Sequence, residues 1–279
     1  MPDWIVHLGV ALLFAVIFRI KNWKLLLTGA LLPDLSRILL ILSNFLGFEE
    51  IKSFLILDPI HTPFVSLLLS LSIALLFNQV FKNLFFIYLG VIIHFALDVL
   101  QFAGAFGNMF FYPFYFKEFS LNLFYAGRII FPVIGLVILL ISLYYLKEKN
   151  HLKINEKFYF SAIPVILAIV LVFSTQDELL NANIHSVNFL SYPENYENRE
   201  IDIYHSRIIS LNPVKLNEMG KIFVLETKED IKLNSLVTIK GIYRDKKIFV
   251  SDIFFHNYNK HIFSLLGLLI YAFLIFKKD

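Results

Sequence analysis

Residues 84–104, LFFIYLGVIIHFALDVLQFAG, are apolar along almost their whole length, yet they contain His94 and Asp98. A bilayer core about 30 Å thick is spanned by about 20 mostly apolar residues in a helix, so this stretch is expected to cross a membrane. An ionisable side chain in such a helix is costly and usually serves a function. Because they are four residues apart, these two share one helical face and suit two ligands of one ion. For the pair alone, a buried His–Asp hydrogen bond that ties helices together is the simpler interpretation.

The composition indicates a membrane protein. Of the 279 residues 58% are hydrophobic, and the mean hydropathy is +0.69, whereas soluble domains contain about 45–50% apolar residues. The chain has no Cys, which excludes disulfides and Cys-ligated metals, so His, Asp or Glu would have to hold any metal. The net charge of +3 is small and the basic residues are dispersed, so no nucleic-acid partner is expected.

Seven stretches are long and apolar enough to be predicted as spans. They are residues 4–20, 25–46, 59–79, 84–104, 129–146, 158–174 and 261–276. Basic residues of short loops stay in the cytoplasm, and here they fall on one side of the predicted spans, at Arg19, Lys21, Lys24, Lys82 and in KEKNHLK (147–153). The sequence therefore predicts an α-helical polytopic protein of the cell membrane with about seven spans, its N-terminus outside and its C-terminus in the cytoplasm. The acidic start MPDW (1–4) argues against a cleavable signal peptide.

Residues 175–260 differ in character, because β-branched and aromatic residues partly alternate with polar ones and turn-forming residues separate them. The predicted strands are IHSVNFL (184–190), IDIYHSRIIS (201–210), GKIFVLET (220–227), SLVTIKGIY (235–243) and KKIFVSDIFFH (246–256). Five short strands fit a small β-barrel outside the cytoplasm, and residues 235–255, with a glycine inside a strand where a barrel must bend, resemble part of an OB-type fold. The predicted domains are a helical membrane domain (1–174), the barrel domain (175–260) and a C-terminal transmembrane anchor (261–279).

Three further residues join the His94–Asp98 pair. His7 lies in the first predicted span, Asp34 in the second and His61 at the start of the third. Each alone has an ordinary interpretation, as a histidine near the end of a span or as a partner of Arg37. With the predicted topology, however, the five fall in the outer half of one bundle, which predicts a shared metal site. Pro33 interrupts the second span, frees the Gly29 carbonyl and could turn Asp34 towards that site.

These motifs resemble a known family. MPDW followed by His7, then GALLPDL (29–35), an isolated His61, GxxxHxxxD (90–98) and YPF (112–114) resemble the LexA-regulated inner-membrane proteins described as metal-dependent hydrolases. The resemblance covers about residues 1–120 and implies a membrane-bound, metal-dependent hydrolase. Ser36 stands where that family commonly carries the second acid of a PDxD motif.

The order His, Asp, His, HxxxD is also similar to that of the zinc-dependent phospholipase C family. This resemblance implies a metal held by Asp34, His61, His94 and Asp98, with Asp98 bridging to a second metal that His7 helps to bind. A downstream His and HxxxE cluster that holds a further zinc in that family is absent, because no histidine occurs between His94 and His151.

Zinc is the expected metal, because with His and carboxylate ligands it supplies hydroxide at neutral pH. Asp34 is the expected catalytic base. Arg37 and Arg128, together with Lys117, are candidate contacts for a substrate phosphate, although membrane anchoring also explains all three. The predicted substrate is a phosphoester or ester of a phospholipid or another lipid-borne molecule in the outer leaflet. Two alternatives remain open: an ion-handling or transport protein, and a noncatalytic membrane anchor that presents the barrel to a partner.

Overall fold

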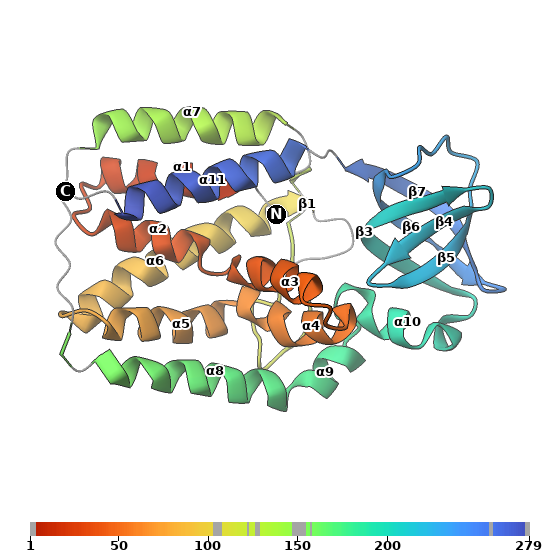
Figure 1. Ribbon diagram of the computed structural model, residues 1–279, viewed down its shortest axis with the longest axis horizontal. Helices are drawn as coiled ribbons and strands as arrows, with labels where there is room; N and C mark the ends of the chain where they lie inside the picture. The colour runs from red at the N-terminus through yellow and green to blue at the C-terminus, as the bar shows by residue number, and fades with distance from the viewer. Residues whose placement is uncertain are drawn as a thin grey trace.

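Helices and a β-barrel occupy opposite ends of the molecule (Figure 1). The computed structural model describes residues 4–102, 108–121, 123–125, 129–146, 155–156, 158–256 and 259–276. The longer helices run roughly along the long axis of the molecule, and the barrel lies beyond one end of them. The last described helix runs from the barrel side to the opposite end of the molecule. Arg128, one of the predicted phosphate contacts, lies outside the described residues.

The helical part alternates longer helices with short connecting ones. Its elements are α1 (Trp4–Ile17), α2 (Trp23–Leu31), α3 (Leu35–Phe45), α4 (Glu50–Leu57), η1 (Asp58–His61), α5 (Pro63–Leu75), α6 (Val80–Val99), β1 (Gln101–Phe102), β2 (Phe124–Tyr125), α7 (Ile130–Tyr145), η2 (Phe158–Ser161), α8 (Ala162–Ser174) and, after the barrel, α11 (Asn259–Phe276). Between α8 and the barrel lie α9 (Gln176–Asn181), η3 (Ile184–Ser186), α10 (Val187–Ser191) and η4 (Pro193–Tyr196).

The prediction of about seven membrane spans is wrong. Among the described helices, only α6 is long and apolar enough to cross a membrane by itself, and counting each bent pair, α2 with α3 and α4–η1 with α5, as one span gives up to 3. Four other apolar helices, Trp4–Ile17, Ile130–Tyr145, Phe158–Ser174 and Ile262–Phe276, have only 10–17 residues. A helix rises about 1.5 Å per residue, so these are shorter than a bilayer core of about 30 Å. Several apolar runs in the sequence continue through turns where the helices end.

Two helix breaks shape the region that faces the barrel. α2 and α3 meet at 51° across Leu32–Asp34, and the α4–η1 segment meets α5 at 72°. The first break was expected at Pro33, which cannot continue the backbone hydrogen-bonding pattern of a helix. The carbonyl of Gly29 is not left free there, because the amide of Leu32 donates to it. At the second break Thr62 caps α5, its hydroxyl accepting from the Val65 amide, and Pro63 occupies the first helical turn.

α2 and α6 cross with their backbones in close contact. A Cβ placed on Gly29 would lie 1.8 Å from the carbonyl oxygen of Ile87, and one on Gly90 would lie 2.1 Å from that of Leu26. Only glycine allows this approach, since any side chain would overlap the neighbouring backbone. The crossing therefore fixes α6, which carries His94 and Asp98, against the end of α2.

The predicted five-stranded barrel is confirmed. Its strands are β3 (Arg199–Leu211), β4 (Val214–Glu218), β5 (Lys221–Glu226), β6 (Leu236–Arg244) and β7 (Lys247–His256), closed in the order β3-β4-β5-β7-β6. β5 and β7 pair in parallel, whereas the other pairs are antiparallel. The register between β6 and β7 shifts at Lys240/Gly241, the glycine expected at a bend.

One predicted strand is wrong, and one strand was missed. IHSVNFL (184–190) forms η3 and most of α10 instead of a strand. The strand that the sequence analysis missed is β4. Val187, Phe189 and Leu190 are buried in the barrel core, so their apolar character comes from packing and not from a sheet. The side chain of Asn183, a residue with positive φ, accepts a hydrogen bond from the Phe189 amide and stabilises the helical turn instead.

The barrel packs directly on the helical part. Ile51 of α4 is buried in the same apolar cluster as Ile208, Leu216 and Ile248 of the barrel. In Figure 1, α3, α4 and α9 lie between the longer helices and the strands, and α10 lies beside the barrel. This arrangement places the barrel next to the two helix breaks, where Asp34 and His61 lie.

Candidate metal centre

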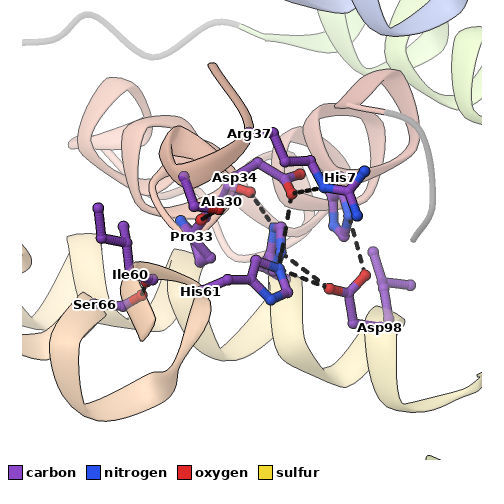
Figure 2. A network of polar contacts seen from close by, with 12 residues as sticks. His7, Ala30, Pro33, Asp34, Arg37, Ile60, His61, Ser66 and Asp98 are labelled. Carbon is purple, nitrogen blue, oxygen red and sulfur yellow. Dashed lines mark hydrogen bonds and ion pairs between the residues drawn. The ribbon is translucent and has the colours of Figure 1, made fainter. Parts of the chain in front are cut away.

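The five residues predicted as metal ligands lie together in the structure. His7 comes from α1, Asp34 precedes α3, His61 ends η1, and His94 and Asp98 lie on α6. All five are buried, with relative exposures of 0–6%. Figure 2 shows His7, Asp34, His61 and Asp98 directed towards one another from separate segments. The two helix breaks and the glycine crossing are what bring these segments to one place.

Four potential ligand atoms lie close together, at His61, His94, Asp98 and Asp34. Nε2 of His61 lies 3.0 Å from Nε2 of His94 and 3.1 Å from Oδ2 of Asp98. The same Asp98 oxygen lies 3.2 Å from Nε2 of His94, and Oδ1 of Asp34 lies 3.7 Å from Nε2 of His61. Four ligands about 2.0–2.1 Å from a tetrahedral zinc ion lie about 3.3 Å from one another. The three separations within His61, His94 and Asp98 are close to that value, so these side chains suit three ligands of one tetrahedral ion, and Asp34 lies beside them.

Backbone contacts orient His94 as a ligand. Its Nδ1 lies 2.8 Å from the carbonyl oxygen of Ala30, at the end of α2. A carbonyl oxygen only accepts hydrogen bonds, so Nδ1 carries the proton and, in the neutral ring, Nε2 has a free lone pair. That lone pair is directed at His61 and Asp98. Metal-ligating histidines typically have such a carbonyl at the other ring nitrogen.

His7 occupies a different position from the other two histidines. Its ring stacks on that of His94, with centroids 3.9 Å apart and planes at 13°. Its Nε2 lies 3.5 Å from Oδ1 of Asp98, the oxygen that faces away from His61. Neither ring nitrogen of His7 has a hydrogen-bond partner among the described residues. His7 therefore approaches the cluster from the side of the second Asp98 oxygen.

The carboxylates bring an excess of negative charge into the cluster. Both oxygens of Asp34 and Oδ2 of Asp98 make no hydrogen bond within the described part of the chain. Buried acceptors without donors are rare and costly. A divalent cation would neutralise the combined charge of two ionised carboxylates and would supply these oxygens with a partner. Two groups of three residues, His7–His94–Asp98 and Asp34–His61–His94, could each hold an ion.

Of the predicted phosphate contacts, only Arg37 is placed at the cluster. Its Nε lies 3.5 Å from Oδ1 of Asp34, and its side chain is 45% exposed. A half-exposed guanidinium beside buried ligands can reach both the site and the surroundings (Figure 2). Lys117 is exposed in the segment between β1 and β2. Ser36, which stands in place of a second acid, donates to the Pro33 carbonyl and so supports the turn that holds Asp34.

Sequence reasoning missed three contributors to this region. The Ala30 carbonyl is a backbone group, which no side-chain pattern reveals. Gln101, just beyond the end of α6, donates to Asp98, and its position three residues after Asp98 in the sequence could have indicated this contact. Tyr204 comes from the bulge of β3, between Ile203 and Ser206. Burial raises the pKa of the Tyr204 hydroxyl, the charge of Arg37 lowers it, and that of Asp98 raises it. The barrel thus presents a phenol to the charges of the cluster.

A separate pocket of about 590 Å³ is lined by residues of the barrel and of the preceding α10 and η4, all outside the cluster. Its lining includes the buried aromatic rings of Phe223 and Tyr243, with Lys221 and Lys246 at the rim. The pocket and the His/Asp cluster therefore have no lining residue in common.

Comparison with known proteins finds no relative. No family model matches the chain, no curated protein matches it, and no solved structure matches it. The family resemblances of the sequence motifs remain predictions, and the case for a metal site depends on the geometry of the cluster.

Proposed function

We propose that this protein is a membrane-bound, metal-dependent hydrolase that uses zinc to cleave a phosphoester of a lipid-borne substrate. The observation that carries the proposal is the His61–His94–Asp98–Asp34 quartet. The ligand atoms of His61, His94 and Asp98 lie 3.0–3.2 Å apart, and Oδ1 of Asp34 lies 3.7 Å from Nε2 of His61. A bound cation would also satisfy both oxygens of Asp34, which make no hydrogen bond among the described residues. The motif order, which resembles that of two hydrolase families, is consistent with this proposal.

The residues of the cluster would have different roles in the reaction. Zinc bound by His and carboxylate ligands lowers the pKa of a bound water to about 7 and polarises a phosphoryl oxygen. His61, His94 and Asp98 would hold the ion. Asp34 has a second oxygen without a hydrogen-bond partner among the described residues, and this oxygen would accept the proton of the attacking water.

Arg37 would bind the substrate phosphate. Its planar guanidinium matches phosphate oxygens in pairs, and its half-exposed side chain lies beside Asp34. The Tyr204 hydroxyl, in the field of Arg37 and Asp98, is placed on the barrel side of the same region. A phosphate held between the guanidinium and the metal would present its phosphorus atom to a water beside Asp34.

The outer surface of the helical part supports a lipid environment. α7, α8 and α11 expose large apolar side chains along their lengths, many of them half exposed or more. They include Ile134, Val137, Leu140, Ile141, Ile163, Ile166, Leu167, Val170, Phe173, Leu265, Leu269 and Phe273. Soluble proteins rarely expose apolar patches of this extent. In the proposed orientation the N-terminus and the barrel lie outside the cell and the C-terminus lies in the cytoplasm.

Hydrolysis of phospholipid in mixed detergent micelles tests the proposed reaction. Protein loaded with zinc is expected to release water-soluble phosphate from the lipid, and removal of zinc by a chelator is expected to stop the release. His94→Ala should abolish both metal binding and hydrolysis, because it removes one of the central ligands. Arg37→Ala should raise KM more than it lowers kcat, because the substitution removes a substrate contact but leaves the metal ligands intact.

Arg19→Ala is the matched control for Arg37→Ala. Arg19 is exposed in the turn after α1, at the end away from the barrel, and its removal should leave zinc content and hydrolysis unchanged. Zinc-loaded, folded wild-type protein that hydrolyses no phospholipid and no soluble phosphoester would contradict the proposed activity.

A further inference from the structure

Gln101 is held rigidly at the end of α6. It forms β1 with Phe102, and this strand pairs in parallel with β2, where Gln101 lies opposite Phe124. The Ser120 hydroxyl donates to the Gln101 carbonyl, and the amides of Leu121 and Leu123 donate to the carbonyls of Val99 and Leu100. Ser120, Leu121 and Leu123 thus fix the backbone around Gln101, a residue that is 1% exposed.

The side-chain amide of Gln101 is directed at Asp98. Its Nε2 donates to Oδ1 of Asp98 at 2.9 Å and to the Leu97 carbonyl at 3.3 Å. Both partners only accept hydrogen bonds, so the nitrogen of the amide, and not its oxygen, must face them. The amide oxygen is buried without a partner among the described residues. The side chain of Gln101 therefore makes the hydrogen bond to Asp98 while its own amide oxygen stays without a hydrogen bond among the described residues.

This contact determines which oxygen of Asp98 faces the cluster. With Oδ1 bound by Gln101, Oδ2 is directed at Nε2 of His61 and of His94, 3.1 and 3.2 Å away. Without this donor the carboxylate could rotate, and Oδ2 would then no longer be directed at the ion. Outer partners of this kind orient metal ligands and raise metal affinity.

We infer that Gln101 is a positioning residue of the metal centre, holding Asp98 so that Oδ2 coordinates the ion. The inference rests on the proposed metal site and goes beyond it, because Gln101 itself neither binds the metal nor contacts the substrate. It assigns a role to the segment after α6, which returns through β2 to clamp the end of that helix.

Zinc affinity tests the inference without depending on catalysis. In full-length protein in detergent, Gln101→Ala should weaken zinc binding by about 10- to 100-fold, measured by competition with a chromogenic chelator. In the cobalt-loaded protein it should shift the visible absorption bands, since the carboxylate changes its coordination. The melting temperature of the metal-free protein should stay close to that of the wild type, which separates positioning from a structural role.

Gln176→Ala is the matched control, because the buried Nε2 of Gln176, in α9, has no hydrogen-bond partner in the described structure. It should leave zinc affinity and the cobalt spectrum unchanged. If Gln101→Ala does not fold, Gln101→Glu decides the question, because it keeps the size but replaces the donor with an acceptor and should weaken zinc binding at least as much.

The outcomes separate this inference from the proposed function. Wild-type zinc affinity and an unchanged cobalt spectrum in the Gln101 variant would overturn the positioning role and leave the metal site intact. A wild-type protein that binds zinc but hydrolyses nothing would overturn the proposed reaction alone. A wild-type protein that binds no metal would overturn both.

Discussion

His94 has the most completely determined surroundings of the residues in the cluster. The Ala30 carbonyl holds one ring nitrogen at 2.8 Å, while the other faces His61 at 3.0 Å and Asp98 at 3.2 Å. The ring of His7 covers one of its faces. A histidine held at both nitrogens and covered on one face has little freedom to rotate. The side chains of the cluster are therefore already arranged to bind a metal ion.

The two other histidines should contribute unequally to metal binding. His61→Ala is expected to weaken zinc binding by more than about 100-fold, because Nε2 of His61 lies within 3.1 Å of two other ligand atoms. His7→Ala should weaken it by only about 10-fold, since His7 approaches a single oxygen, at 3.5 Å. Isothermal titration of zinc into the two metal-free variants measures the difference. Equal losses, or a greater loss for His7→Ala, would contradict the assignment of the quartet.

The identity of the clustered residues could be predicted from the sequence, whereas their roles could not. His94 and Asp98 attract attention because a charged group in an apolar helix is costly, and the order of His7, Asp34 and His61 points to the same site. The difference between His61 and His7 depends on which Asp98 oxygen each of them faces. That detail is set by Gln101 and by the path of α2, which no spacing in the sequence specifies.

At the level of elements, the crossing of α2 and α6 controls the site. The contact between Gly29 and Gly90 allows the Ala30 carbonyl to reach the ring of His94, one helical turn further along α6 than Gly90. The distance between these helices therefore sets the orientation of a predicted ligand.

Gly90→Ala should affect stability and metal binding together. The added methyl would lie 2.1 Å from the Leu26 carbonyl oxygen, so the helices must separate, at a cost of about 1–3 kcal/mol. Loss of the His94–Ala30 hydrogen bond should also weaken zinc binding by about 10-fold. Thermal unfolding and zinc titration in detergent measure the two effects.

Gly241→Ala is the control for this crossing. It adds the same methyl 2.4 Å from the Phe249 carbonyl oxygen, within the barrel, so it should destabilise the protein but leave zinc affinity near that of the wild type. An unaltered zinc affinity in Gly90→Ala, or an equal loss in both variants, would show that the α2–α6 distance does not control the site.

Some elements could be read from the sequence and others could not. The barrel was predictable, because β3, β6 and β7 are long and rich in β-branched and aromatic residues. β4, with VKLNE, is short and polar, so it has little strand pattern of its own and forms by pairing with β3 and β5. The VNFL segment was misread because burial against the barrel gives a helix the same apolar residues as a strand.

For the whole molecule, the junction between the barrel and α4 is expected to respond to pH through Glu218. Glu218, at the end of β4, accepts a hydrogen bond from the Ser206 hydroxyl at 2.8 Å. Burial raises the pKa of Glu218 from 4.5 to about 7, the Ser206 contact lowers it, and the nearby charge of Glu50 in α4 raises it. The folded protein therefore keeps a proton on Glu218 over a pH range in which the unfolded chain loses it.

The free energy of unfolding should fall as the pH rises from about 4.5 to about 7, because the unfolded state binds fewer protons there. Partial exposure of Glu218 limits the loss to about 1–2 kcal/mol. Glu218→Gln should remove this slope, whereas Glu229→Gln, the same change at an exposed glutamate, should retain it. Thermal unfolding in detergent between pH 4.5 and pH 8 measures the slopes. Parallel profiles for the wild type and Glu218→Gln would refute a protonated Glu218.

The proposed orientation predicts which residues are accessible from outside the cell. The chain has no Cys, so single cysteines can be labelled without background. Lys246→Cys, in the exposed turn between β6 and β7, should react with an impermeant maleimide on intact cells. Lys21→Cys, in the exposed turn between α1 and α2, should react only after permeabilisation. The reverse pattern would invert the orientation.

The architecture of the whole molecule was the least predictable level. Hydropathy finds apolar runs but not the angles within them, so α2 and α3 were counted as one span interrupted at Pro33, without the 51° at which they meet. The turns at the two helix breaks place Asp34 and His61 beside α6. The turns thus help to assemble the candidate site, whereas the span count failed mainly because four apolar helices have only 10–17 residues.

Metal content tests the central claim most directly. Full-length protein purified in detergent, incubated with zinc and freed of excess metal by gel filtration, is analysed by inductively coupled plasma mass spectrometry. The wild type is expected to retain at least about one zinc per chain, and His94→Ala, with an intact circular dichroism spectrum, to retain none. Folded wild-type protein without stoichiometric zinc, or a His94→Ala variant that retains it, would contradict a metal centre at this cluster.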